Sequence, residues 1–167
     1  MKKLIFSILL IFATSQLVSA QDLSNWVSGL ALVENAEYQL VDRPMLEASL
    51  AAAKAADSTG MISSQAPPFM EKLESIDVIN LSSCSSEVKD LFLKDLDNIQ
   101  DGNGYETLIN VIDENDKVRI IARRDGTVIP QIFVFAIDGE NNEIVIVRMN
   151  GKMDESDITD IIKQQQK

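Results

Sequence analysis

The sequence contains no histidine and a single cysteine, Cys84, among its 167 residues. Histidine is the most frequent general base in enzymes and the most frequent metal ligand in proteins, so Ser-His-Asp and Cys-His catalytic sites cannot form within this chain. One cysteine also excludes an internal disulfide. These absences remove the commonest catalytic designs and leave the stability of the fold to its hydrophobic core.

Positive charge is scarce as well. The chain has 15 Lys and Arg residues against 26 Asp and Glu residues, which gives a formal net charge of −11. An acidic surface repels phosphate backbones and anionic lipid head groups, so we expect neither nucleic acid nor a membrane surface as a partner. No pattern predicts a cofactor or metal site, and we predict that the protein is not an enzyme.

Long apolar runs are absent except at the amino terminus. Two lysines precede the uncharged residues 4–12, and Val18 and Ala20 have the small side chains that signal peptidases accept. The run is too short to span a bilayer, and no later segment is long and apolar enough to do so. We therefore predict a secretory signal peptide over residues 1–20, cleaved after Ala20.

Residue 21 is glutamine, whereas a bacterial lipoprotein would carry its lipid-bearing cysteine there. We expect the mature protein to be periplasmic or secreted, without a lipid anchor or a transmembrane segment. Removal of the signal peptide, with its two lysines and no acids, leaves 147 residues and a formal net charge of −13. That length is typical of one domain with a real core.

Residues 21–167 are predicted to form a single α+β domain. Apolar spacing, capping residues and an alanine-rich run indicate helices, and short apolar runs indicate strands. Turn-forming residues without a period predict a flexible loop near 57–69. Helices are expected over 23–31 and 45–56 and after the capping residues 82–86, and strands around 38–41 and 76–81.

From Tyr105 onward, apolar and polar residues alternate in four segments that turn-forming clusters separate. This pattern predicts an antiparallel four-strand meander that dominates the sheet and packs with helices. Gly151 is expected to end the sheet, and Asp154 to cap a last helix with apolar residues at 158, 161 and 162. The four strands are expected over 105–113, 117–124, 130–138 and 143–150.

The last two strands carry apolar residues on both faces, among them Phe133, Phe135, Val145 and Val147. An antiparallel sheet with one wet face alternates more cleanly than this. Either these strands are central and covered on both faces, by helices on one and by the amino-terminal segment or the long loop on the other, or their surface binds a partner or a second copy. The decisive question is whether these four side chains are covered.

Ser86 and Lys89 have the Ser-x-x-Lys spacing of penicillin-recognising enzymes, in which the lysine amine activates a hydroxyl one helical turn away. The companion Ser-Asp-Asn and Lys-Thr-Gly motifs are absent, so we expect Ser86 to cap a helix. Cys84 lies near the start of the same helix, where the helix dipole lowers a thiol pKa. A small buried residue is the simpler interpretation of Cys84, and its reactivity stays open.

Acidic residues gather near the turns, but Asp95, Asp97 and Asp101 lack the ligand spacing of a twelve-residue calcium loop. We interpret them as solvated carboxylates. Spacing alone does not exclude a carboxylate pair of the kind that hydrolyses glycosides, although no pair stands out and aromatic stacking surface for a sugar is sparse.

A short positive stripe is expected in the second strand of the meander, where Lys117, Arg119 and Arg123 share one face. Two interpretations are open. The stripe faces outward and pairs with acids on neighbouring strands, or it forms a docking site for an acidic partner.

Structural motifs occur in 104–108, 118–120 and 151–158, and at the entry to the second helix, 42–46. In these motifs the chain resembles the DUF4252 family, a set of uncharacterised envelope proteins of Bacteroidota. The resemblance covers most of the mature chain. It implies an exported protein and supplies no reaction, ligand or catalytic residue.

We therefore expect an exported envelope protein that is not an enzyme and that acts by binding a protein partner or a second copy, or by regulating the envelope. The first alternative is a periplasmic carrier whose two-faced strands line a pocket for a small apolar ligand. A hydrolase that uses only carboxylates is the third hypothesis. The candidate interaction residues are Phe133, Phe135, Val145, Val147, Arg119 and Arg123.

Overall fold

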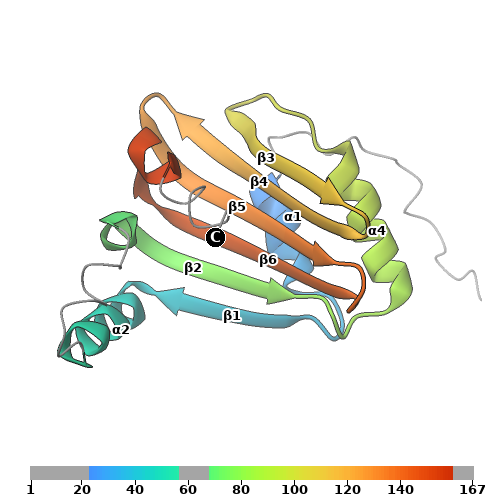
Figure 1. Ribbon diagram of the computed structural model, residues 1–167, viewed down its shortest axis with the longest axis horizontal. Helices are drawn as coiled ribbons and strands as arrows, with labels where there is room; N and C mark the ends of the chain where they lie inside the picture. Colours follow the sequence, from blue (N-terminus) through green and yellow to red (C-terminus); the bar gives the residue numbers. More distant parts are fainter. Residues whose placement is uncertain (1–22, 57–67, 160–167) are drawn as a thin grey trace, which may run out of the picture.

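A computed structural model describes residues 23–56 and 68–159 (Figure 1). The predicted signal peptide and Ile161 and Ile162 of the predicted last helix therefore lie outside the described residues, as does most of the predicted loop, 57–67. The elements are α1 (Leu23–Leu30), β1 (Glu37–Asp42), α2 (Arg43–Ala56), η2 (Pro68–Lys72), β2 (Leu73–Asn80), α4 (Ser86–Asn98), β3 (Tyr105–Asp113), β4 (Asp116–Asp125), β5 (Val128–Asp138) and β6 (Glu143–Met153).

All six strands form one antiparallel sheet in the order β1-β2-β6-β5-β4-β3. The predicted α+β class is confirmed, and so is the meander of the last four strands. β2 pairs with β6, so the amino-terminal strands extend the meander at its β6 side (Figure 1). Within the described residues, no helix is long and apolar enough to cross a membrane.

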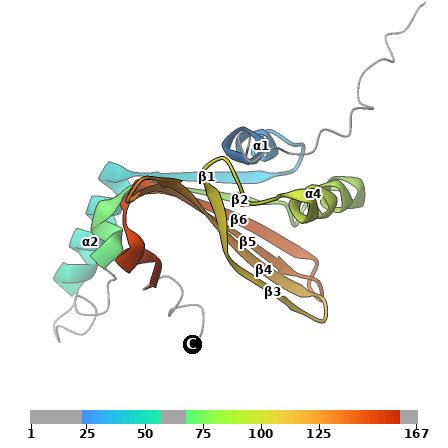
Figure 2. The same cartoon turned by 90° about the horizontal axis from the view of Figure 1, so that it is seen from above.

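Two helices lie on one side of the sheet. α1 buries Leu23, Val27 and Leu30, whose spacing places them on one helix face. α4 begins after its N-cap Ser85, whose hydroxyl accepts a hydrogen bond from Val88 N at 3.4 Å. Figure 2 shows α1 and α4 on the same side of the sheet, whereas α2 lies at one end, toward the other side.

The face beneath α1 and α4, which we call the helix-covered face, holds the aromatic core. Trp26 of α1 stacks on Phe92 of α4 at a centroid distance of 5.6 Å, and both rings contact Phe135 of β5. Phe133, Ile121 and Ile146 complete this layer with 0–1% of their surface exposed. Aromatic contacts of this kind fix the two helices against the central strands.

The opposite face, which we call the open face, carries Val78, Val134, Val145 and Val147. Its described cover gathers at one end of the sheet, where Leu46 of α2, Phe69 of η2 and Ile158 pack on strand residues. Figure 2 shows the sheet bending toward the side on which α2 lies. On the helix-covered face the central strands are therefore buried, although Tyr38, Leu40 and Ile112 toward its edges are 46–65% exposed. On the open face the described cover lies mainly at one end.

Several boundaries and orientations differ from the sequence prediction. β6 continues through Gly151 to Met153, because Gly151 pairs with Leu73 of β2. In α4 the helix turns Lys89, Phe92 and Leu96 inward, and Leu91 is 58% exposed. Ser85 rather than Ser86 caps that helix.

The close approach of β6 to the η2–β2 junction generates a stability prediction. A Cβ on Gly151 would lie 2.5 Å from Lys72 O and 3.0 Å from Leu73 Cα. Gly151→Ala should therefore lower the free energy of unfolding by about 1–3 kcal/mol through overpacking. Gly29 in α1 has open space around its Cβ position, so Gly29→Ala should raise it by about 0.5 kcal/mol. Urea unfolding of both variants checks this, and equal effects would contradict the packing.

Candidate functional site

Phe133 and Phe135 lie in the core and expose none of their surface. Side chains of α1 and α4 cover them, so these two predicted interaction residues are not available to a partner. Val145 and Val147 of β6 point to the other side of the sheet and lie half-buried on the open face. The side chains of Phe133 and Phe135 are thus covered, whereas those of Val145 and Val147 are only partly covered.

The positive stripe is not outward-facing at its centre, which corrects the first interpretation of it. Arg119 is 8% exposed and donates to Leu96 O at 2.7 Å and to Ile99 O at 2.8 Å. These carbonyls end α4, where a helix leaves acceptors without partners and favours a cation. Lys117 pairs with Asp97 of α4, and Arg123 is exposed. Arg119 therefore anchors a helix and does not form a docking stripe.

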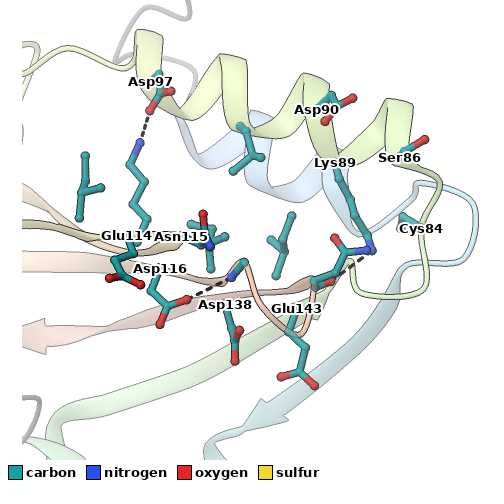
Figure 3. A pocket seen from close by; sticks show the side chains of 17 residues that line it. Cys84, Ser86, Lys89, Asp90, Asp97, Glu114, Asn115, Asp116, Asp138 and Glu143 are labelled. Atoms are coloured by element: carbon teal, nitrogen blue, oxygen red, sulfur yellow. Dashed lines mark hydrogen bonds and ion pairs between the residues drawn. The ribbon is translucent and has the colours of Figure 1, made fainter.

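A groove with a volume of about 640 Å³ lies between α4 and the turns that join β3 to β4 and β5 to β6 (Figure 3). Ser86 and Lys89 both line it, but the amine of Lys89 donates to Ser82 O at 2.6 Å and to Asn142 O at 3.2 Å. The amine thus clamps a loop to the β5–β6 turn, and the Ser-x-x-Lys spacing forms no activated hydroxyl.

Cys84 is buried at the edge of the same groove, with 7% of its surface exposed. Burial raises the pKa of its thiol, and the nearby charge of Lys89 only partly opposes this effect. A thiol with a raised pKa carries little thiolate, which is the reactive form. The structure therefore places Cys84 among packed core residues, as the simpler interpretation proposed.

The groove has a mixed lining of apolar and charged side chains. Leu93, Ile137 and Ile144 line it, and at one end the Lys117–Asp97 ion pair crosses from strand to helix (Figure 3). Within residues 23–56 and 68–159, no three acidic or cysteine side chains lie close enough together to hold a metal ion.

A buried polar network fastens α1 and β1 to the sheet. Asp77 of β2 is 3% exposed and accepts from Tyr38 Oη at 2.6 Å, Arg148 Nε at 2.9 Å and Asn150 Nδ2 at 3.0 Å. Burial opposes ionisation of Asp77, but hydrogen bonds from Arg148 and Tyr38 outweigh it, and its pKa is lowered. The hydrogen bond to Asp77 in turn raises the pKa of Tyr38. The network is a structural fastener, because its groups satisfy one another.

Arg148 extends this network to α1. Its Nη1 donates to Ser28 Oγ at 2.8 Å and to Ser24 O at 3.2 Å. The Arg148 side chain therefore joins β6, β2 and α1, and it holds α1 against the sheet. The sequence reasoning did not single out Asp77 or Arg148. Their signal was one charged residue inside each of two apolar runs, 76–79 and 144–149.

The strand register arranges the open face in rows that cross the sheet. One row runs from Val78 through its neighbours on β6, β5 and β4 to Ile109 of β3. The next runs from Val145 through β5 and β4 to Val111, which is 55% exposed. Apart from the buried Ile120, the remaining side chains of these rows are half-buried. We call the two rows the apolar band; it consists of Val78, Val147, Val134, Ile120, Ile109, Val145, Ala136, Val118 and Val111.

The row beyond the apolar band contains only carboxylates. Asp113 pairs with Asp116, and Asp138 pairs with Glu143, in the strand register at the β3–β4 and β5–β6 turns. The amide of Gly139 donates to Asp116 at 3.1 Å and links the two turns. We call these four residues the acidic row. None of the ion pairs among the described residues involves them.

Asp113, Asp138 and Glu143 lie at the ends of predicted strands and Asp116 lies between two of them, but the sequence analysis does not predict their alignment. In an up-and-down meander, alternate turns lie at the same end of the sheet, so two acidic turns two strands apart become neighbours. This rule, applied to the predicted meander, is the sequence signal for the alignment of the acidic row.

Comparisons with known proteins place the chain by family only. The family model described as a domain of unknown function, DUF4252, matches residues 37–161. No curated protein and no solved structure matches the chain. The matched region contains every strand of the sheet and begins after α1.

The network around Asp77 predicts a pH-dependent loss of stability. Asp77→Asn leaves the charge of the partly buried Arg148 without its counter-ion, so the free energy of unfolding should fall by about 3 kcal/mol at pH 7. Because the folded-state pKa of Asp77 is lowered, this contribution is present above the unfolded pKa of about 4 and is lost as the pH falls through the folded value.

Urea unfolding at pH 7 and at about pH 3 measures this difference. The gap between wild type and Asp77→Asn should narrow at the lower pH. Asp90→Asn, on the exposed side of α4, is the matched control and should change stability by less than about 0.5 kcal/mol. A gap below about 1 kcal/mol at pH 7 would contradict the role of the network.

Proposed function

Since this chain belongs to the DUF4252 family, whose function is unknown, we propose a function from its own architecture. The protein is a non-enzymatic exported protein that binds a partner protein through the apolar band of the open face. Both the export of the protein and its binding to a partner protein are part of this proposal. The observation that carries it is that the side chains of the apolar band, apart from Ile120, stay partly exposed among the described residues.

The apolar band has the properties of a binding surface. It consists of aliphatic side chains from five neighbouring strands, and Val111 at its edge is more than half exposed. From β2 to β3 the strand spacing gives it a width of about 19 Å, and two residue rows give it a depth of about 7 Å between their Cα lines. Contiguous apolar surface of this kind is typical of interaction sites.

An address outside the cytoplasm rests on the sequence. The two lysines, the apolar run and the small residues before Gln21 support export, and the resemblance to envelope proteins of Bacteroidota supports the same conclusion. A glutamine at position 21 favours a periplasmic or secreted protein over a lipid-anchored one.

A carrier of a small apolar ligand is the second candidate. The groove under α4 favours it, because its volume of about 640 Å³ lies in the range of ligand sites. The pocket that the sequence suggested around Phe133 and Phe135 is filled by Trp26 and Phe92.

No observation within the described residues favours a carboxylate-only hydrolase. Asp154 and Asp157 share the amine of Lys72, and hydrogen bonds from Lys72 and Ser156 lower the pKa of Asp154.

Site-specific photo-crosslinking in the source organism tests the binding function. A photoreactive residue in place of Val134 or Val145 should give an adduct with the same partner protein, because both positions lie in the apolar band. The same residue in place of the exposed Leu91 on α4 is the control and should not give it.

The adduct from position 134 should also be lost when Val147→Asp places a charge in the band. Adducts that are equal at all three positions, or absent from both band positions, would contradict the proposal. An adduct of twice the mass of the chain would show a second copy instead of a partner.

A further inference from the structure

The acidic row borders the apolar band on β3, β4, β5 and β6, and this arrangement specifies the chemistry of the partner. We propose that the partner segment is a cationic amphipathic helix that lies across the strands, with its apolar stripe on the band and its Lys or Arg side chains on the acidic row. This inference rests on the proposed function and deepens it.

The dimensions of the surface fit a helix. The band extends about 19 Å from β2 to β3, which is the length of a helix of about 13 residues. Its two rows lie about 7 Å apart, so one helix with a diameter of about 10 Å covers both. The acidic row lies one further row spacing away, within reach of a Lys or Arg side chain on the flank of that helix.

The charges fit as well. Asp113, Asp116 and Glu143 are exposed, and Asp138 is half-buried. Hydrogen bonds from the amide and side chain of Asn141 lower the pKa of Asp138, which favours its ionised form. Four carboxylates in a line without ion-pair partners among the described residues produce a local negative field, and this field attracts a row of cations and repels an acidic surface.

The same field disfavours a second copy of this chain. The protein has a formal net charge of −11, so two such surfaces repel one another. α2 and the helical turn that contains Ile158 also stand on this side of the sheet at the end opposite the acidic row (Figure 2). A slim helix fits beside these elements, whereas a second flat sheet would meet them.

The test uses a synthetic probe and the full mature chain. The probe is an amphipathic helical peptide with a leucine stripe and lysines along one flank, and its counterpart carries glutamate at the same flank positions. Binding is measured by isothermal titration calorimetry at low and physiological salt. The lysine peptide should bind at least about tenfold more tightly than the glutamate peptide, and this advantage should shrink as salt screens the acidic row.

Paired variants locate the contacts. Asp113→Asn with Glu143→Gln neutralises two members of the acidic row and should weaken binding of the lysine peptide about fivefold. Glu87→Gln with Asp90→Asn changes the net charge equally on α4 and is the matched control, which should leave binding unchanged. Val134→Thr with Val147→Thr should weaken binding of the lysine peptide at least about tenfold, whereas Val128→Thr at the opposite end of the sheet should not.

The outcomes distinguish a failure of the cationic-helix inference from a failure of the proposed binding function. Equal weakening by the acidic-row pair and by the α4 pair would show non-specific attraction and overturn the inference. Equal binding of both peptides, lost in the two band variants, would overturn the cationic partner and keep the proposed function. Binding of either peptide that is indifferent to the band variants, or no binding at all, would overturn the inference. Sedimentation that shows a dimer, abolished by the band variants, would identify a second copy as the occupant. Circular dichroism and urea midpoints confirm that each variant is folded.

Discussion

Two apolar faces on one antiparallel sheet create the constraint on which this structure depends. Each face must be removed from water, since apolar area contributes to stability only when it is buried. α1 and α4 cover the central strands of one face, with Trp26 and Phe92 against Phe135. The other face receives cover at one end from α2, η2 and the turn around Ile158. The half-covered band follows from this unequal division.

Polar fasteners determine which areas the helices cover. Arg119 binds the last carbonyls of α4, and Arg148 binds serines of α1 while it pairs with Asp77. Lys72 joins η2 to the carboxylates of Asp154 and Asp157. Buried or partly buried charge-assisted hydrogen bonds are directional, so each helix has one favoured position on the sheet. None of these hydrogen bonds lies over the apolar band, and its side chains other than Ile120 stay partly exposed among the described residues.

The sequence predicted the features that local patterns encode. Alternation and turn clusters gave the four-strand meander with strand ends within a few residues, and the overall α+β class was correct. The apolar character of both faces of β5 and β6 was also evident. Which face the helices cover was not, because it depends on contacts between α1 and strands more than 100 residues later, such as Ser28 with Arg148. Long-range docking has no signature in a local window.

The charged residues show the same limit. Arg119 was interpreted as outward because strands place cations in water by default, but the carbonyls that end α4 provide a buried set of acceptors. Asp77 was overlooked because its counter-ion lies on another strand. The acidic row was not predicted, because only the register of β3 to β6 aligns its four carboxylates. In each case the missing information was a contact between distant segments.

The central claim is that the valines of the apolar band contact solvent, whereas the isoleucines of the core beneath α1 and α4 do not. Methyl NMR with a soluble gadolinium chelate measures this directly in the full chain. Methyl signals of Val78, Val134 and Val147 should broaden strongly, and those of Ile121 and Ile146 should not. Protection of the three valines equal to that of the two isoleucines would contradict the account.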